Sequence, residues 1–412
     1  MTSVKSKLLE IVLDLSDKIE QLADFILLGD VLPMAKQSFI ALFINLGNLL
    51  SGLSVASVLN SLKQQPWIFR IYPQILGTRG ILAGIFSART STSLHLGLIE
   101  PSLKRNTSYF YSLGAAMLLL TLAGALVISI LFTFSTLTVL LEVHVIIYST
   151  ILLVAPLSFF IISAIAFKAF KKGLDPDILL YPFSSVINDI LISLVFIEIG
   201  RLIVRGFSFL LIPVTLFFIA AYIAIGYYVY EREEREVLVS TIKEGFTALL
   251  IGLTIELGTG SVLSTLLSGE KRVAEIALMY PVMLSTLGGS ASIIGSMVTT
   301  RIAIGEFDFS PQSFKNILQN IIGLQIASVF FHAILSVIVS LIAGSFYRIF
   351  MLFMFAYISH VLGFIIMIPI ILLTAYETVK RGLDPDNFVN PIESSIADFV
   401  ETFSIALVSM IL

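Results

Sequence analysis

Two aspartates inside otherwise apolar segments are the residues of this sequence best placed to bind a cation. Asp189 lies within SSVINDILISLVF and Asp398 within SSIADFVETFSIA. Each follows a serine by four residues, Ser185 in one case and Ser394 in the other, which puts a hydroxyl and a carboxylate on one face of a helix. A charge at the centre of a membrane helix costs about 2.5–3.5 kcal/mol, so both aspartates are candidates for function.

Carboxylate and hydroxyl oxygens are hard ligands, and Mg²⁺ is commonly held through one or two carboxylates while it keeps several waters. Glu256 is the next candidate ligand. Asn48 offers an amide earlier in the chain, in a region where Leu49 aligns with Glu256. We therefore expect a metal-binding set made of Asp189, Asp398, Glu256, Ser185, Ser394 and Asn48. The alternative is that the aspartates only fix helix packing through hydrogen bonds to neighbouring backbone.

The composition excludes several other classes of protein. The 412 residues are 57% hydrophobic and only 13% charged, whereas soluble domains carry about 25% charged residues. The net charge of −3 gives no basic surface for nucleic acid, and the absence of cysteine excludes disulfides and thiolate chemistry. The sequence therefore predicts an all-α, polytopic protein of the lipid bilayer.

Eleven apolar stretches are long enough to cross about 30 Å of hydrocarbon as helices. They run near residues 38–60, 69–88, 107–134, 138–167, 180–200, 206–230, 245–267, 276–300, 317–344, 349–379 and 388–411. With a cytoplasmic N-terminus, seventeen Lys and Arg residues lie on the inside and six on the outside. The positive-inside rule then predicts a multi-pass protein of the cell membrane with its N-terminus inside and its C-terminus outside.

The second half of the sequence repeats the first with an offset of about 208 residues. The matching stretches include KKGLDPD at 171–177 with KRGLDPD at 380–386, and FIALFINL at 39–46 with FTALLIGL at 246–253. Five helices per copy would invert the second copy, but the extra span at 206–230 restores its direction. We therefore expect two parallel five-helix repeats related by a pseudo-two-fold axis along the membrane normal.

These features divide the chain into four parts. Residues 1–35 form an amphipathic cytoplasmic or interfacial segment, 36–204 the first repeat, 205–242 a linker helix with a charged loop, and 243–412 the second repeat. Because one chain supplies both halves, we expect a monomer to suffice for a pathway between them.

One charged residue breaks the symmetry of the repeats. Arg79 lies inside the second span, at a position where the second copy has Leu287. A guanidinium in the membrane interior needs a carboxylate partner or access to water. The small and hydroxyl residues of 76–91 and 284–300 allow close helix packing and also leave polar groups to line a hydrated pathway.

The motif GLDPD followed by Pro-x-x-Ser-x-x-x-Asp resembles the signature of the MgtE family of Mg²⁺ channels and transporters. In that family an aspartate of the corresponding helix binds the permeating ion, which implies this role for Asp189 and Asp398. The stretch 280–308 is similar to a Gly-rich family segment, although the usual Asn and Gln residues are replaced here, and Glu256 stands where the family often has a glutamate. The two-copy layout resembles the eukaryotic solute-carrier branch of the family and its archaeal relatives, in which one chain forms both halves of the pore.

The resemblance implies transport of a divalent cation rather than catalysis, with Mg²⁺ as the first candidate and Mn²⁺ or another divalent ion as the second. A Na⁺- or H⁺-coupled exchanger would use the same carboxylates and bind cargo and coupling ion in alternation. Two further classes stay open. One is a membrane scaffold without transport. The other is an intramembrane aspartyl protease, but its Gly-x-Gly-Asp motif is missing because the chain has INDI and IADF around its aspartates.

Overall fold

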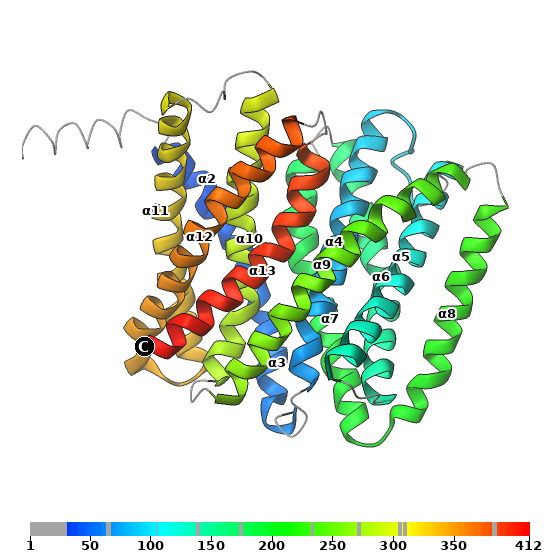
Figure 1. Cartoon of the computed structure of the whole chain (residues 1–412), viewed down its shortest axis with the longest axis horizontal. Helices are drawn as coiled ribbons and strands as arrows, with labels where there is room; N and C mark the ends of the chain where they lie inside the picture. Colours follow the sequence, from blue (N-terminus) through cyan, green and yellow to red (C-terminus); the bar gives the residue numbers. More distant parts are fainter. Residues whose placement is uncertain are drawn as a thin grey trace, which may run out of the picture.

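The protein is a bundle of long α-helices in the computed structural model (Figure 1). The structure describes residues 31–62, 67–104, 106–136, 141–172, 176–231, 235–269, 273–303, 307, 311–380 and 385–412. The predicted N-terminal segment up to residue 30, and the central residues of both GLDPD loops, lie outside this part. No strand occurs among the described residues, so the predicted all-α fold is confirmed.

Eleven helical segments form the described part of the bundle. The first runs without a break through α2 (Val31–Ile44), the 3₁₀ segment η1 (Asn45–Asn48) and α3 (Leu49–Leu62). The others are α4 (Trp67–His95), α5 (Ser108–Thr136), α6 (Leu141–Lys171), α7 (Pro176–Val204), α8 (Ser208–Tyr230), α9 (Arg235–Gly269), α10 (Val273–Ala303), α11 (Pro311–Ile342), α12 (Ile349–Lys380) and α13 (Pro385–Ile411). Each predicted span corresponds to one of these segments.

The two repeats run in the same direction. In Figure 1, α2 and α9 start at the same end of the bundle, because α8 crosses back between the repeats. Helix α8 packs against α5 and α6 of the first half. Helices α7 and α13 both begin at the proline of the GLDPD motif, Pro176 and Pro385, since proline lacks an N–H and fits the first helical position.

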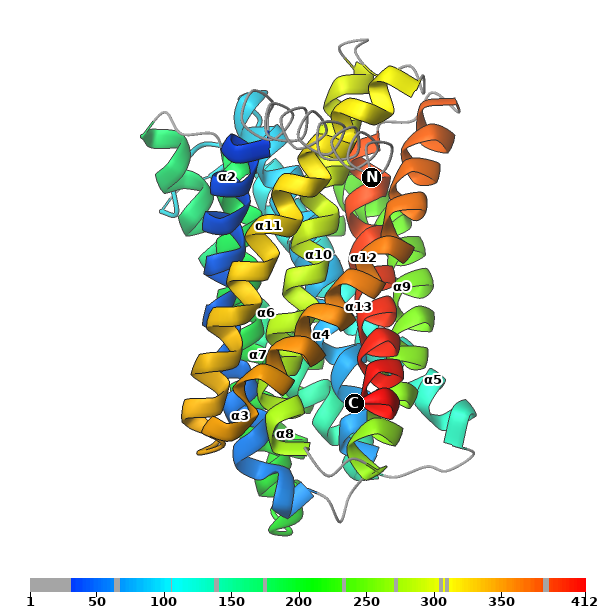
Figure 2. The same ribbon diagram turned by 90° about the vertical axis from the view of Figure 1, so that its left-hand side faces the viewer.

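The first helix of each repeat packs mainly on the opposite repeat. Helix α2 lies beside α11 (Figure 2), and its continuation α3 packs on α10. In the same way α9, the first helix of the second repeat, packs on α5 and α4 of the first. The halves therefore exchange their leading helices instead of meeting along one flat interface.

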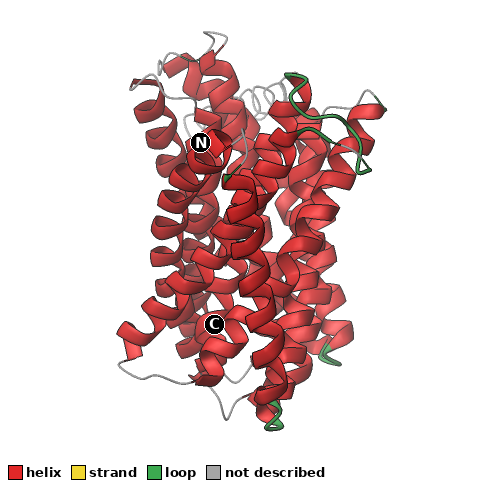
Figure 3. Ribbon diagram, turned by 90° about the vertical axis from the view of Figure 1, so that its right-hand side faces the viewer, coloured by secondary structure: helices red, strands yellow, loops and turns green. Residues whose placement is uncertain are grey.

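Nine helices of the described residues are long and apolar enough to cross a membrane. The other two, α4 and α7, are more polar because they contain the charged residues Arg70, Arg79, Arg89, Asp189, Glu198 and Arg201. With 29 residues each, however, α4 and α7 match their repeat counterparts α10 and α13, which have 31 and 27. The described loops, green in Figure 3, lie at the ends of the bundle.

Two glycines mark where the leading helices cross the opposite repeat. A Cβ on Gly52 of α3 would fall onto the backbone carbonyl of Leu278 in α10, and a Cβ on Gly260 of α9 would fall onto that of Arg70 in α4. Both members of each pair are separated by 208 residues from their counterparts. Only glycine permits backbones to approach this closely, so the two crossings are the same packing solution used twice.

The 3₁₀ segment η1 explains why the repeats are offset by 207 residues before it and by 208 after it. A 3₁₀ helix rises about 2.0 Å and turns about 120° per residue, against about 1.5 Å and 100° for an α-helix. The four residues of η1 thus cover roughly the length and rotation of five α-helical residues. The first copy lacks one residue relative to the continuous helix α9, and η1 absorbs the difference.

Candidate functional site

The candidate ion-binding residues lie at mid-height in the bundle, where α4, α7, α9, α10 and α13 pack around the junction of the repeats. Asp189 and Asp398 each come thirteen residues after the first residue of their helix, about 20 Å along it. Asp398 lies within electrostatic range of Asp189 and Arg79, so the two predicted aspartates do approach each other across the repeats.

Asp189 is surrounded by groups that neutralise or donate to it. The guanidinium of Arg79 in α4 forms an ion pair with Oδ1 of Asp189. The amide Nδ2 of Asn48 in η1 donates to Oδ2 at 3.2 Å, and the hydroxyl of Ser185 donates to the same oxygen at 3.4 Å. Arg79 therefore has the carboxylate partner that its position required, and the first-repeat cluster carries no net charge.

Asp398 has a different neighbour. The carboxyl groups of Asp398 in α13 and Glu256 in α9 lie within hydrogen-bonding reach of each other. The Glu256 side chain is 0% exposed, and among the described residues no N–H or O–H group donates to either of its carboxyl oxygens. Two carboxylates held this close repel each other unless a cation or a proton lies between them. The second-repeat cluster is thus a pair of acids without a protein counter-ion.

The two clusters occupy equivalent places. The offset of 208 residues set by the glycine crossings pairs Asn48, not Leu49, with Glu256, which corrects the sequence alignment by the one residue that η1 absorbs. The neighbouring helix follows the same offset. Asn48 donates through Nδ2 to the hydroxyl of Ser285 in α10, and Glu256 lies against the counterpart of Ser285, Gly77 in α4.

Other buried acids also lie in the second repeat. Glu393 and Glu401 of α13 are almost fully buried, against Gly295 of α10 and Gly363 of α12 respectively. No described donor reaches their carboxyl oxygens. Ser394, the counterpart of Ser185, points across the repeats toward Gly80 of α4. Within the described residues, no three His, Asp or Glu side chains form a direct metal cage.

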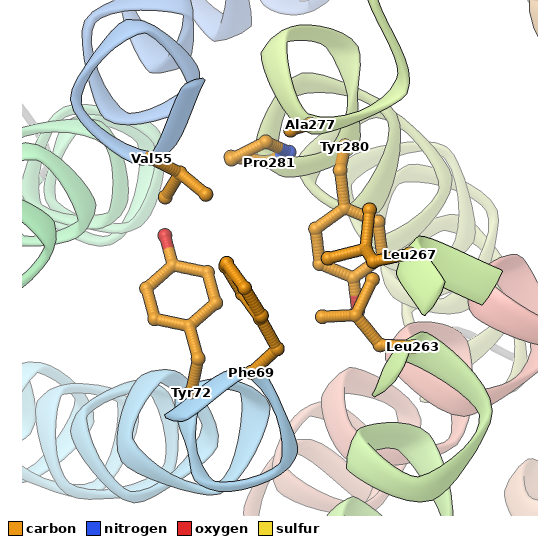
Figure 4. A pocket seen from close by; sticks show the side chains of 8 residues that line it. All are labelled: Val55, Phe69, Tyr72, Leu263, Leu267, Ala277, Tyr280 and Pro281. Atoms are coloured by element: carbon orange, nitrogen blue, oxygen red, sulfur yellow. The ribbon is translucent and has the colours of Figure 1, made fainter. Parts of the chain in front are cut away.

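One end of the passage between the repeats is closed. One turn beyond the aspartates, the hydroxyl of Tyr72 hydrogen-bonds to Ser193 at 2.8 Å, and that of Tyr280 hydrogen-bonds to Thr402 at 2.9 Å. The tyrosines border a small pocket (Figure 4), which otherwise has apolar walls. Its lining residues are Val55, Phe69, Tyr72, Leu263, Leu267, Ala277, Tyr280 and Pro281.

Toward the opposite end, α4 and α10 become accessible. Residues 71–78 and 276–284 are all buried, but Gly84 and Gly288, further along the same helices, are partly exposed. A methyl group on either glycine would meet no atom within 4 Å. The clusters around Asp189 and Asp398 lie where the sealed stretch gives way to the accessible one, as expected of a site that opens to one side of a membrane.

Several residues of this site were not predicted from the sequence. The partner of Arg79, the facing positions Ser285 and Gly77, and the tyrosine hydroxyls emerge only when distant helices are brought together. The equal spacing of Tyr72 and Tyr280 in the repeat was the one available signal for the tyrosine pair.

Ionisable side chains buried between two parallel helical repeats, accessible from one end and sealed at the other, define a membrane transport protein. A comparison with known families agrees. The sequence model of the MgtE divalent cation transporters matches residues 72–199 and 280–408, one match per repeat and together more than half of the chain. The chain belongs to this family: it is a divalent cation transporter and not an enzyme. No curated protein and no solved structure matches it significantly.

Proposed function

We propose that this protein moves Mg²⁺ across the cell membrane between its two repeats, with Asp398 and Glu256 as the groups that bind the ion. The observation that carries the proposal is the pairing of these two carboxyl groups. They face each other in the membrane interior, Glu256 is fully buried, and among the described residues it receives no donor. An arrangement of this kind requires a positive charge from outside the protein.

The donor set fits Mg²⁺ better than a soft or strongly dehydrated ion. Two carboxylates with hydroxyl groups nearby suit a small cation that keeps part of its water shell and is held through one or two acidic groups. Ser394 of α13 supplies a hydroxyl on the accessible side of Asp398. Mn²⁺ prefers similar oxygen ligands and is the second candidate.

The direction of the chain in the membrane follows from charge. Lys and Arg are concentrated at the end where α4 finishes and α5 begins, which places this end, and the accessible side of the site, in the cytoplasm. The C-terminus then lies outside the cell. Both repeats, 36–204 and 243–412, contribute to the passage, so one chain is sufficient for transport.

The test is ion flux into liposomes that contain the purified chain. A Mg²⁺-sensitive dye inside the liposomes should report uptake by the wild-type protein, and Asp398→Asn or Glu256→Gln should slow it at least about tenfold. The matched control is Glu198→Gln in α7, which removes a carboxylate paired with Arg201 at the helix end. Uptake by Asp398→Asn at the wild-type rate would place the pathway elsewhere, and uptake that requires a Na⁺ or proton gradient would identify a coupled exchanger.

A further inference from the structure

The two pseudo-equivalent clusters differ at four positions, and the differences depend on one another. The first cluster has Arg79 and Asn48 next to Asp189, and Ser285 across the repeat boundary. At the same positions the second cluster has Leu287, Glu256 and Gly77, next to Asp398. Whole residues have therefore been exchanged at one site while the geometry of the backbone has been kept.

The exchanges reverse the charge of the site. In the first cluster a permanent guanidinium cation is paired with one carboxylate, and arginine does not lose its proton in proteins. In the second cluster an apolar side chain replaces the cation, and an acid replaces the amide. The first site thus carries its own positive charge, whereas the second must receive one.

The neighbours of each cluster permit no mixture of the two. The amide of Asn48 uses its two N–H groups on Asp189 and on the hydroxyl of Ser285, which itself donates to the carbonyl of Pro281 at 2.9 Å. At Gly77, by contrast, a Cβ would lie less than 3 Å from the Glu256 carboxyl group. A serine is therefore needed in one cluster and is sterically excluded from the other.

We propose that Arg79 is a tethered cation that permanently fills the first of two pseudo-equivalent ion sites, so that each chain binds a single transported divalent ion, at Asp398 and Glu256. This inference rests on the proposed function and makes it more specific. Asp189 is then the counter-ion of Arg79 and not a ligand of the transported ion. The other buried acids, Glu393 and Glu401, lie in the same repeat as the working site.

The distribution of buried carboxyl groups supports this assignment independently. Glu256, Glu393 and Glu401 all belong to the second repeat and have no donor among the described residues. The first-repeat counterparts of two of them are the uncharged Asn48 and Ile192, and that of Glu393 is Ser184. The electrostatic attraction for a cation is therefore concentrated on one side of the pseudo-two-fold axis.

Counting bound Mn²⁺ by electron paramagnetic resonance on the purified chain tests the proposal. We expect one Mn²⁺ per wild-type chain and at least a tenfold loss of affinity in Glu256→Gln. The charge-neutral double variant Arg79→Leu/Asp189→Asn should still bind one ion with an affinity within about threefold of the wild type. Loss of binding in this double variant would overturn the proposal, as would two ions, or none at millimolar Mn²⁺, in the wild-type chain.

A gain-of-site variant gives the sharper result. Arg79→Leu/Asn48→Glu/Ser285→Gly copies the second cluster into the first, and a folded chain of this kind should bind two ions. The wild-type count and the double variant decide the question if this variant does not fold. Liposome flux separates the two ideas: one bound Mn²⁺ without any divalent flux contradicts the proposed function alone, and flux with two bound ions contradicts only the single-site inference.

Discussion

Asn48 occupies in the first repeat the position that Glu256 occupies in the second, and each contacts the aspartate of its own half. The amide donates to Asp189, which Arg79 already neutralises, while the acid meets Asp398 without a counter-ion. A pair of positions related by an internal repeat thus has opposite electrostatic roles. Equivalent substitutions in the two halves should consequently have opposite effects.

We expect Asp189→Asn to destabilise the protein and Asp398→Asn to leave its stability unchanged or raise it. The side chains of Arg79 and Asp189 are only 11% and 10% exposed, so removal of the aspartate leaves a buried cation without a partner, at a cost of about 3–5 kcal/mol. Removal of Asp398 relieves repulsion from Glu256 instead. Thermal unfolding in detergent, followed by loss of the monodisperse chromatographic peak, measures both effects.

Arg79→Leu is the control for this asymmetry. Added to Asp189→Asn, it removes the unpaired cation and should restore most of the lost thermal stability. Equal losses for Asp189→Asn and Asp398→Asn would show that the two aspartates have the same surroundings, contrary to the contacts described above.

The crossing glycines should tolerate no side chain. In Gly52→Ala and Gly260→Ala the new methyl group meets a backbone carbonyl, which cannot move aside as a flexible side chain would, so we expect each to lose about 1–3 kcal/mol or more. Gly84→Ala, in a helix but with open space around it, should be neutral or stabilising by up to about 1 kcal/mol. Melting temperatures of the three variants provide the comparison, and a stable Gly52→Ala would contradict the close crossing.

Thiol labelling can show which end of the passage is open, because the chain has no cysteine of its own. Gly84→Cys should react with a membrane-impermeant maleimide applied from the cytoplasmic side of oriented vesicles. Val55→Cys, in the lining of the closed pocket and 5% exposed, should react at least about tenfold more slowly from either side. Faster labelling at Val55→Cys than at Gly84→Cys would mean that the closed and open ends have been exchanged.

The two tyrosine hydroxyls should contribute equally. Tyr72→Phe and Tyr280→Phe each remove one buried hydrogen bond, to Ser193 and to Thr402, and we expect each to cost about 0.5–1.5 kcal/mol. Because the bonds occupy equivalent places, the two melting temperatures should fall by similar amounts. Tyr109→Phe, which removes a hydroxyl from α5, outside the pocket lining, is the control, and a large difference between the two test variants would argue against equivalent roles.

Most of the fold could be predicted from the sequence, since the number of helices, their order and the parallel repeats follow from hydropathy and from matching motifs. The glycines that fix the crossings were not identified in this way. Gly52 and Gly260 look like any other small residues in membrane helices until the carbonyls of Leu278 and Arg70 are placed against them. The exchange of leading helices was also hidden, because hydropathy contains no information on which helices are neighbours.

The candidate site could be predicted only in part. Asp189 and Asp398 were found by type and spacing, and the structure brings them into electrostatic range of each other. Their different surroundings were not foreseen, because the alignment paired Glu256 with Leu49. A one-residue difference that is absorbed by a 3₁₀ turn leaves no mark in composition or hydropathy. Arg79 was recognised as needing a partner, but its choice of Asp189 depends on how α4 packs on α7.

The exchange of leading helices has a consequence for how the protein is made. During synthesis α2 and α3 enter the membrane first, but their principal neighbours, α10 and α11, begin only at Val273 and Pro311. The first transmembrane segment therefore has to remain in the lipid, or in contact with the insertion machinery, until most of the chain has been translated. The buried Asn48 reaches its final contact with Ser285 at that late stage, so assembly of the membrane-embedded cluster is among the last steps of biogenesis.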